Sequence, residues 1–185
     1  MAAADVTLSK FRTVDMADIA IFAVLMAVCA WISIPMAVPF TLQTFAVFAA
    51  LGTLGGKRGT YAVAVYLLLG AVGLPVFAGF KSGLAALLGT TGGYILGFFV
   101  SALLYWLIIA KLGSSLPVTL GAMVLGLLVC YAFGTAWFLL IYAKTTGPVG
   151  LLTALGWCVF PFVVPDLCKL GLALALSRRV RPLLK

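Results

Sequence analysis

The stretch from Gly92 to Lys111 reads GGYILGFFVSALLYWLIIAK, and its only charge is the lysine at its end. A helix needs about 20 predominantly apolar residues to cross the hydrocarbon core of a bilayer. The same composition runs through the whole chain of 185 residues, of which 65% are hydrophobic and 9% are charged. Soluble domains carry about 25% charged residues. The sequence therefore predicts an integral membrane protein.

Further apolar runs flank this stretch, and turn residues such as Pro35, Gly55 and Gly56 separate them. We expect an all-α, polytopic fold with six transmembrane helices at approximately 18–34, 40–54, 61–73, 92–111, 118–142 and 149–176. No linker or low-complexity stretch divides the chain. Residues 1–185 are therefore predicted to form a single integral membrane domain.

The formal net charge of +8 comes from basic residues that stand singly or in pairs between apolar runs. A nucleic-acid surface would gather them into one stripe, so we interpret the charge as membrane topology. Cytoplasmic segments carry an excess of Lys and Arg. With both termini in the cytoplasm, the outer segments hold only Lys81 and Lys144. The cytoplasmic segments then hold Lys10, Arg12, Lys57, Arg58, Lys111, Arg178, Arg179, Arg181 and Lys185.

Two ionisable residues, Asp166 and Lys169, fall inside the last predicted helix. A charge at the centre of a transmembrane helix costs about 2.5–3.5 kcal/mol on insertion scales, and such residues generally face an interior cavity. The two residues are three positions apart, so they share a helix face and can pair. Pro161 and Pro165 also remove backbone donors here. We interpret this set as a binding site for a ligand with N–H and C=O groups; the alternative is a structural ion pair that locks two helices.

The segment 74–91 is too interrupted by Gly and Pro for a spanning helix, and too apolar for an ordinary solvent loop. Non-helical backbone at membrane depth is tolerated where it is buried in protein or lines a cavity. We therefore predict a lid over a pocket, with Phe77 and Phe80 as its apolar cover. Lys81 is placed to meet an anionic group, or else is an exposed lysine at the membrane boundary.

Small residues form a stripe on the first predicted helix, at Ala20, Ala23, Ala27 and Ala30. Such a stripe lets another helix approach closely, and that helix belongs either to this chain or to another subunit. Polar residues at the start of the second helix, Gln43 among them, either contact a ligand or cap the helix.

The sequence offers few residues that could act in catalysis or bind a metal. The chain has no His and no Glu, and its four cysteines lie in apolar segments without metal-type spacing. General acid–base and metal catalysis need such groups. We predict no catalytic residue, no metal and no cofactor. No P-loop motif occurs, so any ATP hydrolysis would come from partner subunits.

Four segments resemble the BioY family: Pro39-Phe-Thr-Leu-Gln-Thr-Phe45, Gly73-Leu-Pro-Val-Phe-Ala-Gly79, Leu88-Gly-Thr-Thr-Gly-Gly-Tyr94 and Val164-Pro-Asp-Leu-Cys-Lys169. Members of that family are the biotin-binding S components of energy-coupling-factor (ECF) transporters. The resemblance implies a substrate site near the outer face, beneath the loop between helices three and four. It also implies that an alanine motif on helix one contacts the transmembrane coupling subunit.

The resemblance assigns polar ligand contacts to Asp166 and Lys169, and a lid with its hinge to residues 79–94. We expect the ureido ring of biotin at Asp166 and Lys169, and its carboxylate near Lys81; alternatively Lys169 serves the carboxylate. The predicted substrate-binding residues are Asp166, Lys169, Lys81, Gln43, Phe77, Thr91 and Tyr94. The predicted partner-binding residues are Ala20, Ala23 and Ala27.

The family resemblance further implies two ATPase subunits, one coupling membrane protein, and a place in the cytoplasmic membrane of a bacterium or archaeon. The nearest alternative is an S component for another vitamin. A stand-alone facilitator would require a continuous polar path, yet away from their ends the predicted spans carry only Asp166 and Lys169 as charged residues.

Overall fold

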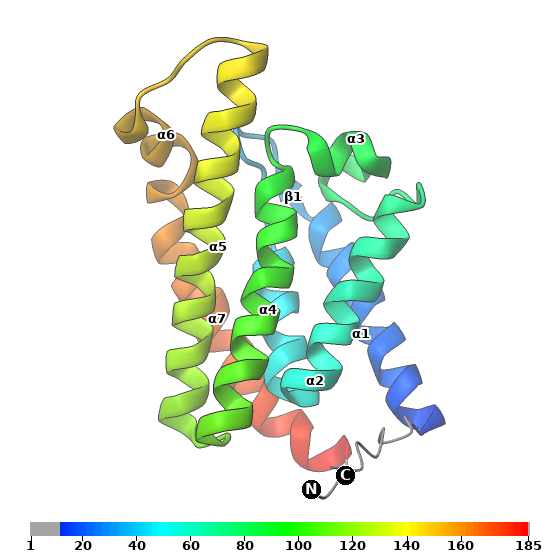
Figure 1. Cartoon of the computed structure of the whole chain (residues 1–185). Helices are drawn as coiled ribbons and strands as arrows, with labels where there is room; N and C mark the ends of the chain where they lie inside the picture. Colours follow the sequence, from blue (N-terminus) through cyan, green and yellow to red (C-terminus); the bar gives the residue numbers. More distant parts are fainter. Residues whose placement is uncertain (1–11, 185) are drawn as a thin grey trace, which may run out of the picture.

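The computed structural model describes residues 12–184 as a bundle of helices aligned roughly along one axis (Figure 1). The elements are α1 (Thr13–Trp31), β1 (Ser33–Ile34), β2 (Phe40–Thr41), α2 (Gln43–Ala71), η1 (Ala78–Phe80), α3 (Gly83–Leu88), α4 (Gly92–Leu112), α5 (Leu116–Thr145), α6 (Leu151–Cys158), α7 (Phe160–Val180) and η2 (Arg181–Leu184). β1 and β2 pair antiparallel, with Ser33 opposite Thr41.

α2 consists of two limbs that fold back on each other. The backbone leaves the helical region at Gly55, where φ is 81° and ψ is 173°, a conformation that glycine adopts without steric cost. Gly59 on the second limb lies so close to the first that a Cβ there would be 2.8 Å from the Cα of Leu51. Figure 1 shows the first limb descending to this turn and the second rising from it. The limbs correspond to the second and third predicted helices, with a much shorter connection than 55–60.

Within residues 12–184, four helical segments are long and apolar enough to cross a membrane: α1, α4, α5, and α7 continued by η2. Together with the two limbs of α2, they are compatible with the six expected crossings. The last expected helix, 149–176, is divided at Val159 into α6 and α7. Pro161 lies in the first turn of α7, where its missing N–H is tolerated, whereas inside a continuous helix it would remove a hydrogen bond.

The first helix lies earlier in the chain than expected, from Thr13 to Trp31 rather than over 18–34. The residue before a proline is disfavoured in the helical region, and Ile34, which precedes Pro35, lies in strand β1. The earlier start brings Asp15 into α1, and both Asp15 and Asp18, the first residue of the predicted helix, are largely buried. The spans therefore hold more charge than Asp166 and Lys169 alone.

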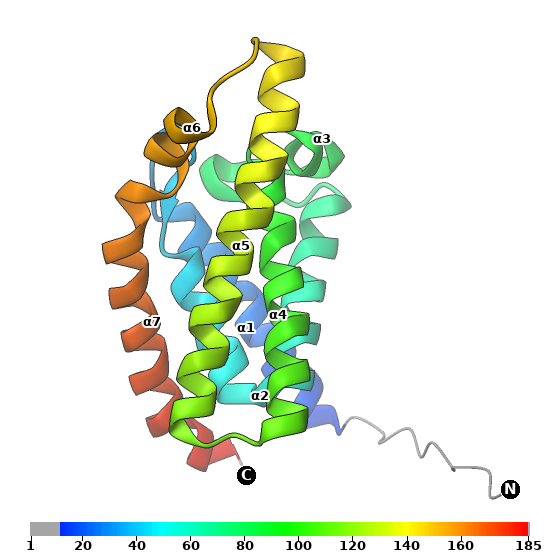
Figure 2. The same cartoon turned by 60° about the vertical axis from the view of Figure 1, so that its left-hand side comes forward.

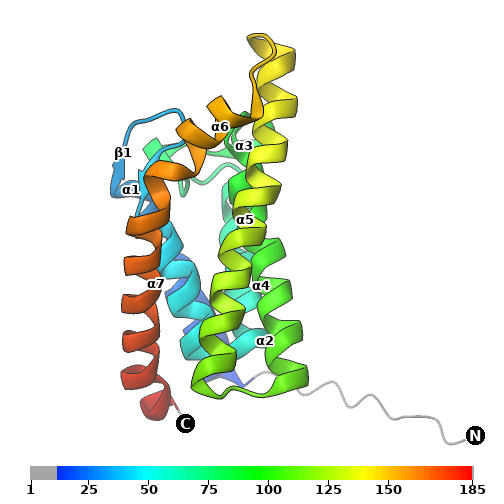
Figure 3. The same ribbon diagram turned by 90° about the vertical axis from the view of Figure 1, so that its left-hand side faces the viewer.

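α2 is the central element, since it packs against α1, α4 and α7. Every residue from Ala46 to Leu51 on its first limb is fully buried, as expected for a helix that is apolar on all sides. α4 and α5 pack along each other. α7 stands apart from this pair in Figures 2 and 3, and α6 crosses from the top of α5 to the top of α7.

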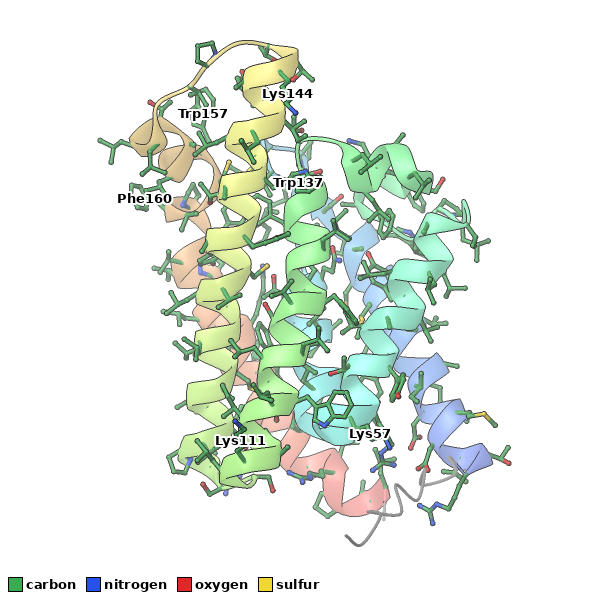
Figure 4. The ribbon with its side chains drawn as sticks, viewed as in Figure 1. Lys57, Lys111, Trp137, Lys144, Trp157 and Phe160 are labelled. Carbon is green, nitrogen blue, oxygen red and sulfur yellow. The ribbon has the colours of Figure 1, made fainter. Side chains whose placement is uncertain are left out.

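Basic residues gather at the end of the bundle where α1 begins, which we call the basic end. Figure 4 shows Lys57 and Lys111 there, and Lys144 at the opposite end. Arg58 beside the α2 turn and Arg178 in the last turn of α7 also belong to the basic end. Two of the predicted cytoplasmic residues, Lys10 and Lys185, lie outside the described residues. Large apolar side chains are exposed along the sides of the bundle, as a lipid environment requires.

A candidate ligand cavity beneath the lid segment

A cavity of about 550 Å³ lies at the end of the bundle opposite the basic end. Residues of the β1–β2 region, the lid segment (residues 74–91), α4, α5, α6 and α7 line it. Pockets of about 300–1,000 Å³ suit small organic ligands. All seven predicted substrate-binding residues line this one cavity: Gln43, Phe77, Lys81, Thr91, Tyr94, Asp166 and Lys169. Their contact with a ligand remains a prediction.

The deepest polar feature of the cavity is the ion pair between Asp166 and Lys169. The Lys169 ammonium lies 2.8 Å from Asp166 Oδ1, and the two residues are 3% and 5% exposed. Lys169 also donates to the Thr41 carbonyl oxygen at 2.6 Å, and Tyr131 donates to Asp166 Oδ2 at 2.7 Å. The pair thus ties α7 to β2 and α5 while it faces the cavity. Both alternatives considered for it, a binding site and a structural lock, are compatible with this geometry.

Aromatic rings support the ammonium of Lys169. Its Nζ lies 3.9 Å from the centre of the Phe40 ring, and Phe40 stacks on Phe162 at 5.9 Å between centres. A ring face attracts a cation, and more strongly where water is excluded. A carboxylate has about four acceptor positions and an ammonium three donors. The pair therefore retains hydrogen-bonding capacity toward the cavity after these internal contacts.

Gln43 brings a second polar group to the cavity from the start of α2. The residue is 4% exposed, and its Nε2 is buried near the Tyr66 hydroxyl without a hydrogen bond of good geometry to any described residue. A buried donor left unpaired costs about 1–3 kcal/mol. Because Gln43 lines the cavity, a ligand acceptor could remove this cost.

Phe77 anchors the lid segment to the second limb of α2. Its ring is 1% exposed, meets Tyr66 edge-to-face at 5.6 Å, and occupies the space where a Cβ at Gly70 would stand. Tyr66 donates to the Val76 carbonyl oxygen at 3.2 Å. This part of the cavity wall is consequently fixed by packing.

Two tryptophans hold the ends of the lid segment. Trp31 of α1 donates to the Pro75 carbonyl oxygen at 2.8 Å and stacks on Phe80 at 5.2 Å. Trp137 of α5 donates to the Gly89 carbonyl oxygen at 3.0 Å. Phe80, expected as apolar cover, lines the cavity but remains 63% exposed, with φ at 58°. The lid segment is therefore held in place by contacts with helices that are distant in the sequence.

The remaining predicted residues differ in how firmly they are held. Tyr94 on α4 is 7% exposed, and its hydroxyl lies 2.9 Å from the Thr135 Oγ1. Thr91 stands immediately before α4. Lys81 is exposed, and its carbonyl oxygen accepts a bond from the Phe77 N–H at 3.1 Å. Lys81 is thus placed at the rim of the cavity by its own strand-like pairing.

Comparison of the sequence and the fold with known proteins shows the family of this chain. The BioY family matches residues 3–185. The chain belongs to the BioY family. A biotin transporter BioY of Thermotoga maritima is 46% identical over 150 residues, which cover 80% of this chain and 75% of that protein. A probable biotin transporter BioY of Pyrococcus horikoshii is 39% identical over 164 residues, or 88% of this chain and 93% of that protein.

A solved structure is also similar to this BioY family member. It is a crystal structure of the S-component for biotin from an ECF-type ABC transporter, with a TM-score of 0.80 and 28% sequence identity. The match covers 91% of this chain and 90% of that chain. The bundle with its broken last helix is therefore an S-component fold.

The predicted partner-binding residues of this BioY family member differ in solvent exposure. Ala23 and Ala27 are 1% and 5% exposed on α1, which packs along α2. Ala20 is exposed. Of the three predicted residues, two are thus buried within this chain, because the stripe follows the face that meets α2. Only Ala20 is accessible to another subunit in this arrangement.

Three residues of the site were not identified from the sequence: Tyr131, Phe40 and Phe162. Tyr131 lies in an apolar run of α5, and its partner Asp166 is distant in the chain. Proximity to a deep charge is the property that singles out all three, and only the packed structure shows it.

Proposed function

We propose that this chain is the biotin-binding, substrate-specific subunit of an ECF-type transporter and serves biotin uptake. The observation that carries the proposal is one cavity in which a buried carboxylate, a buried ammonium and an unpaired amide donor converge. Biotin offers ureido N–H and C=O groups, an apolar thioether ring and valeryl chain, and a carboxylate, so its groups complement this set. Membership of the BioY family supports the same ligand.

The ion pair favours one orientation of biotin over the other. Asp166 lies 2.8 Å from the Lys169 ammonium, so a ligand carboxylate at Lys169 would also approach the Asp166 carboxylate. Like charges at such a distance repel. The ureido ring, which is neutral, meets no such repulsion. We therefore place the ureido ring at the ion pair and Gln43, and the ligand carboxylate toward Lys81 at the rim.

Transport requires partners in this proposal. The sequence contains no P-loop, so ATP is hydrolysed by partner subunits. The resemblance to the BioY family implies two ATPase subunits and one coupling membrane protein. The chain itself binds and carries, and has no catalytic residue. Its basic end faces the cytoplasm, because cytoplasmic segments are enriched in Lys and Arg, and the cavity faces outward.

The first test of this function is the ligand that the purified protein retains, identified by mass spectrometry. Biotin is expected; a different retained vitamin, with no binding of added biotin, would contradict the proposal.

The site is tested by titration of the purified protein with biotin. Asp166→Asn and Lys169→Ala should each weaken binding at least about tenfold, because each breaks a buried charge pair. Lys144→Ala, at the same end but outside the cavity, is the control and should bind normally. Unchanged affinity in both site variants would refute the site.

A further inference from the structure

A second cavity, of about 380 Å³, lies at the basic end of the bundle and is separate from the biotin cavity. The turn of α2 forms one wall, α4 forms another, and Asp15 and Arg181 complete it. We call it the basic pocket. It has no part in the proposed biotin site.

Cations outnumber carboxylates in the basic pocket. Among the described residues, Lys57, Arg58 and Arg181 line it together with a single carboxylate, that of Asp15. Asp15 Oδ1 lies 2.7 Å from Arg58 Nη1, and its Oδ2 accepts the Arg12 backbone N–H at 3.0 Å. The carboxylate is thus directed mainly at Arg58, and the three basic side chains that line the pocket carry more charge than this one carboxylate.

Arg181 retains donors for an anion. Its Nη2 donates to the Ser114 Oγ at 3.3 Å, whereas a guanidinium carries five N–H groups in a planar fork. That fork matches phosphate geometry in particular. The contact with Ser114 also holds the Arg181 side chain beside the turn between α4 and α5.

The pocket lies at the boundary of the apolar region. Trp106 forms part of its wall, with its ring centre 6.4 Å from that of Tyr61. Tryptophan and tyrosine favour the level of lipid headgroups. Figure 4 shows Lys57 at the end of the bundle, where α2 turns.

An apolar track leads away from the pocket toward the middle of the bundle. Ala110 lines the pocket, and Leu107 and Leu103 follow it on the same face of α4 at helical spacing. Their side chains are 55% and 43% exposed. A free phosphate ion makes no use of such a track, whereas the acyl chain of a lipid can lie along it.

We propose that the basic pocket binds the phosphate headgroup of an anionic membrane lipid, with an acyl chain along the Leu103–Leu107 face. Lys57 and Arg181 contact the phosphate, and Trp106 packs beside the headgroup. Basic pockets between transmembrane helices on the cytoplasmic side recognise lipid headgroups in this way.

The test is native mass spectrometry of the full chain released from bilayers of phosphatidylglycerol and phosphatidylcholine. The wild type should retain phosphatidylglycerol selectively. Arg181→Gln should lower that retention about fivefold, and Lys57→Ala with Arg181→Gln should lower it further. The matched control removes two charges from the same end outside the pocket, Lys111→Ala with Arg178→Gln, and should retain the lipid. Normal biotin binding shows that each variant is folded, and the single variant suffices if the double one is not.

Three outcomes would overturn the proposal. Equal loss in the control would mean that the attraction is diffuse. Competition by millimolar inorganic phosphate as effective as that by the lipid would identify a free-phosphate site. Full lipid retention in the Lys57 and Arg181 variants, with failure to assemble with the coupling subunit, would identify a protein contact.

Discussion

Gln43 and Tyr131 line the same cavity but differ in their hydrogen bonding. Tyr131 already donates to Asp166 Oδ2 at 2.7 Å, so it positions the carboxylate that a ligand would meet. The Nε2 of Gln43 has no hydrogen bond of good geometry to any described residue. Buried polar groups are hydrogen-bonded with few exceptions, and each exception calls for an explanation. A ligand that completes the network provides one.

Replacement of Gln43 should separate binding from folding. Gln43→Leu removes the unpaired donor and keeps a side chain of similar size. We expect the melting temperature of the ligand-free protein to stay equal or to rise, because the cost of the buried donor disappears. Biotin affinity should fall about tenfold or more. Thermal unfolding and biotin titration measure the two effects, and a lower melting temperature with normal affinity would assign Gln43 a purely structural role.

At the scale of elements, the lid segment depends on α1 and α5. The indole N–H groups of Trp31 and Trp137 donate to Pro75 and Gly89, near its two ends. A hydrogen bond of this kind contributes about 0.5–1.5 kcal/mol net. The lid is thus held by a few contacts of modest strength, which suits a segment that has to open for a ligand.

Loss of these two hydrogen bonds should speed biotin release. Trp31→Phe and Trp137→Phe keep an aromatic ring and remove the donor, and each should raise the dissociation rate about twofold to tenfold. Exchange of labelled biotin against unlabelled biotin measures this rate. Trp157→Phe serves as the control, since Trp157 on α6 packs on Tyr142 rather than on the lid segment. Identical release from all three variants would show that these bonds do not control opening.

The turn of α2 rests on one glycine. Gly55 has φ 81° and ψ 173°, and a side chain in such a region costs on the order of 1–3 kcal/mol. Gly55→Ala should therefore lower the melting temperature by several degrees. Gly121→Ala on α5 is the matched control, because Gly121 is helical and a Cβ added there would meet nothing within 4 Å; it should be neutral or slightly stabilising. A neutral Gly55→Ala would mean that the turn relaxes without strain.

The two ends of the whole bundle differ in charge, and the larger cavity lies at only one of them. The basic end carries the α2 turn, the start of α1 and the end of α7, and the opposite end carries the proposed biotin cavity. Separation of this kind orients a protein in the bilayer. In the proposed function, the ligand enters at the end with the cavity and the basic end faces the ATPase subunits.

The proposed orientation predicts which lysines face outward. In a chain without its natural cysteines, Lys144→Cys should react with a membrane-impermeant maleimide in intact cells. Lys111→Cys should react only after the membrane is permeabilised. Labelling of both in intact cells, or the reverse pattern, would contradict an outward-facing cavity.

The membrane fold follows from the amino-acid sequence, because the length and hydropathy of each apolar run are local properties that decide whether it can cross a bilayer. The sequence also identified Asp166 and Lys169, since a charge in an apolar run stands out without any partner. The Gly- and Pro-rich lid segment was visible for the same reason. All seven predicted ligand residues line one cavity.

The contacts that those residues make depend on tertiary packing. The tertiary structure joined the two limbs of α2 through the φ of Gly55, and turned Ala23 and Ala27 inward against α2. It also brought Tyr131 to Asp166 and Trp31 to the lid segment. These contacts join residues far apart in the chain. No local pattern encodes them, because they arise from how apolar faces pack together.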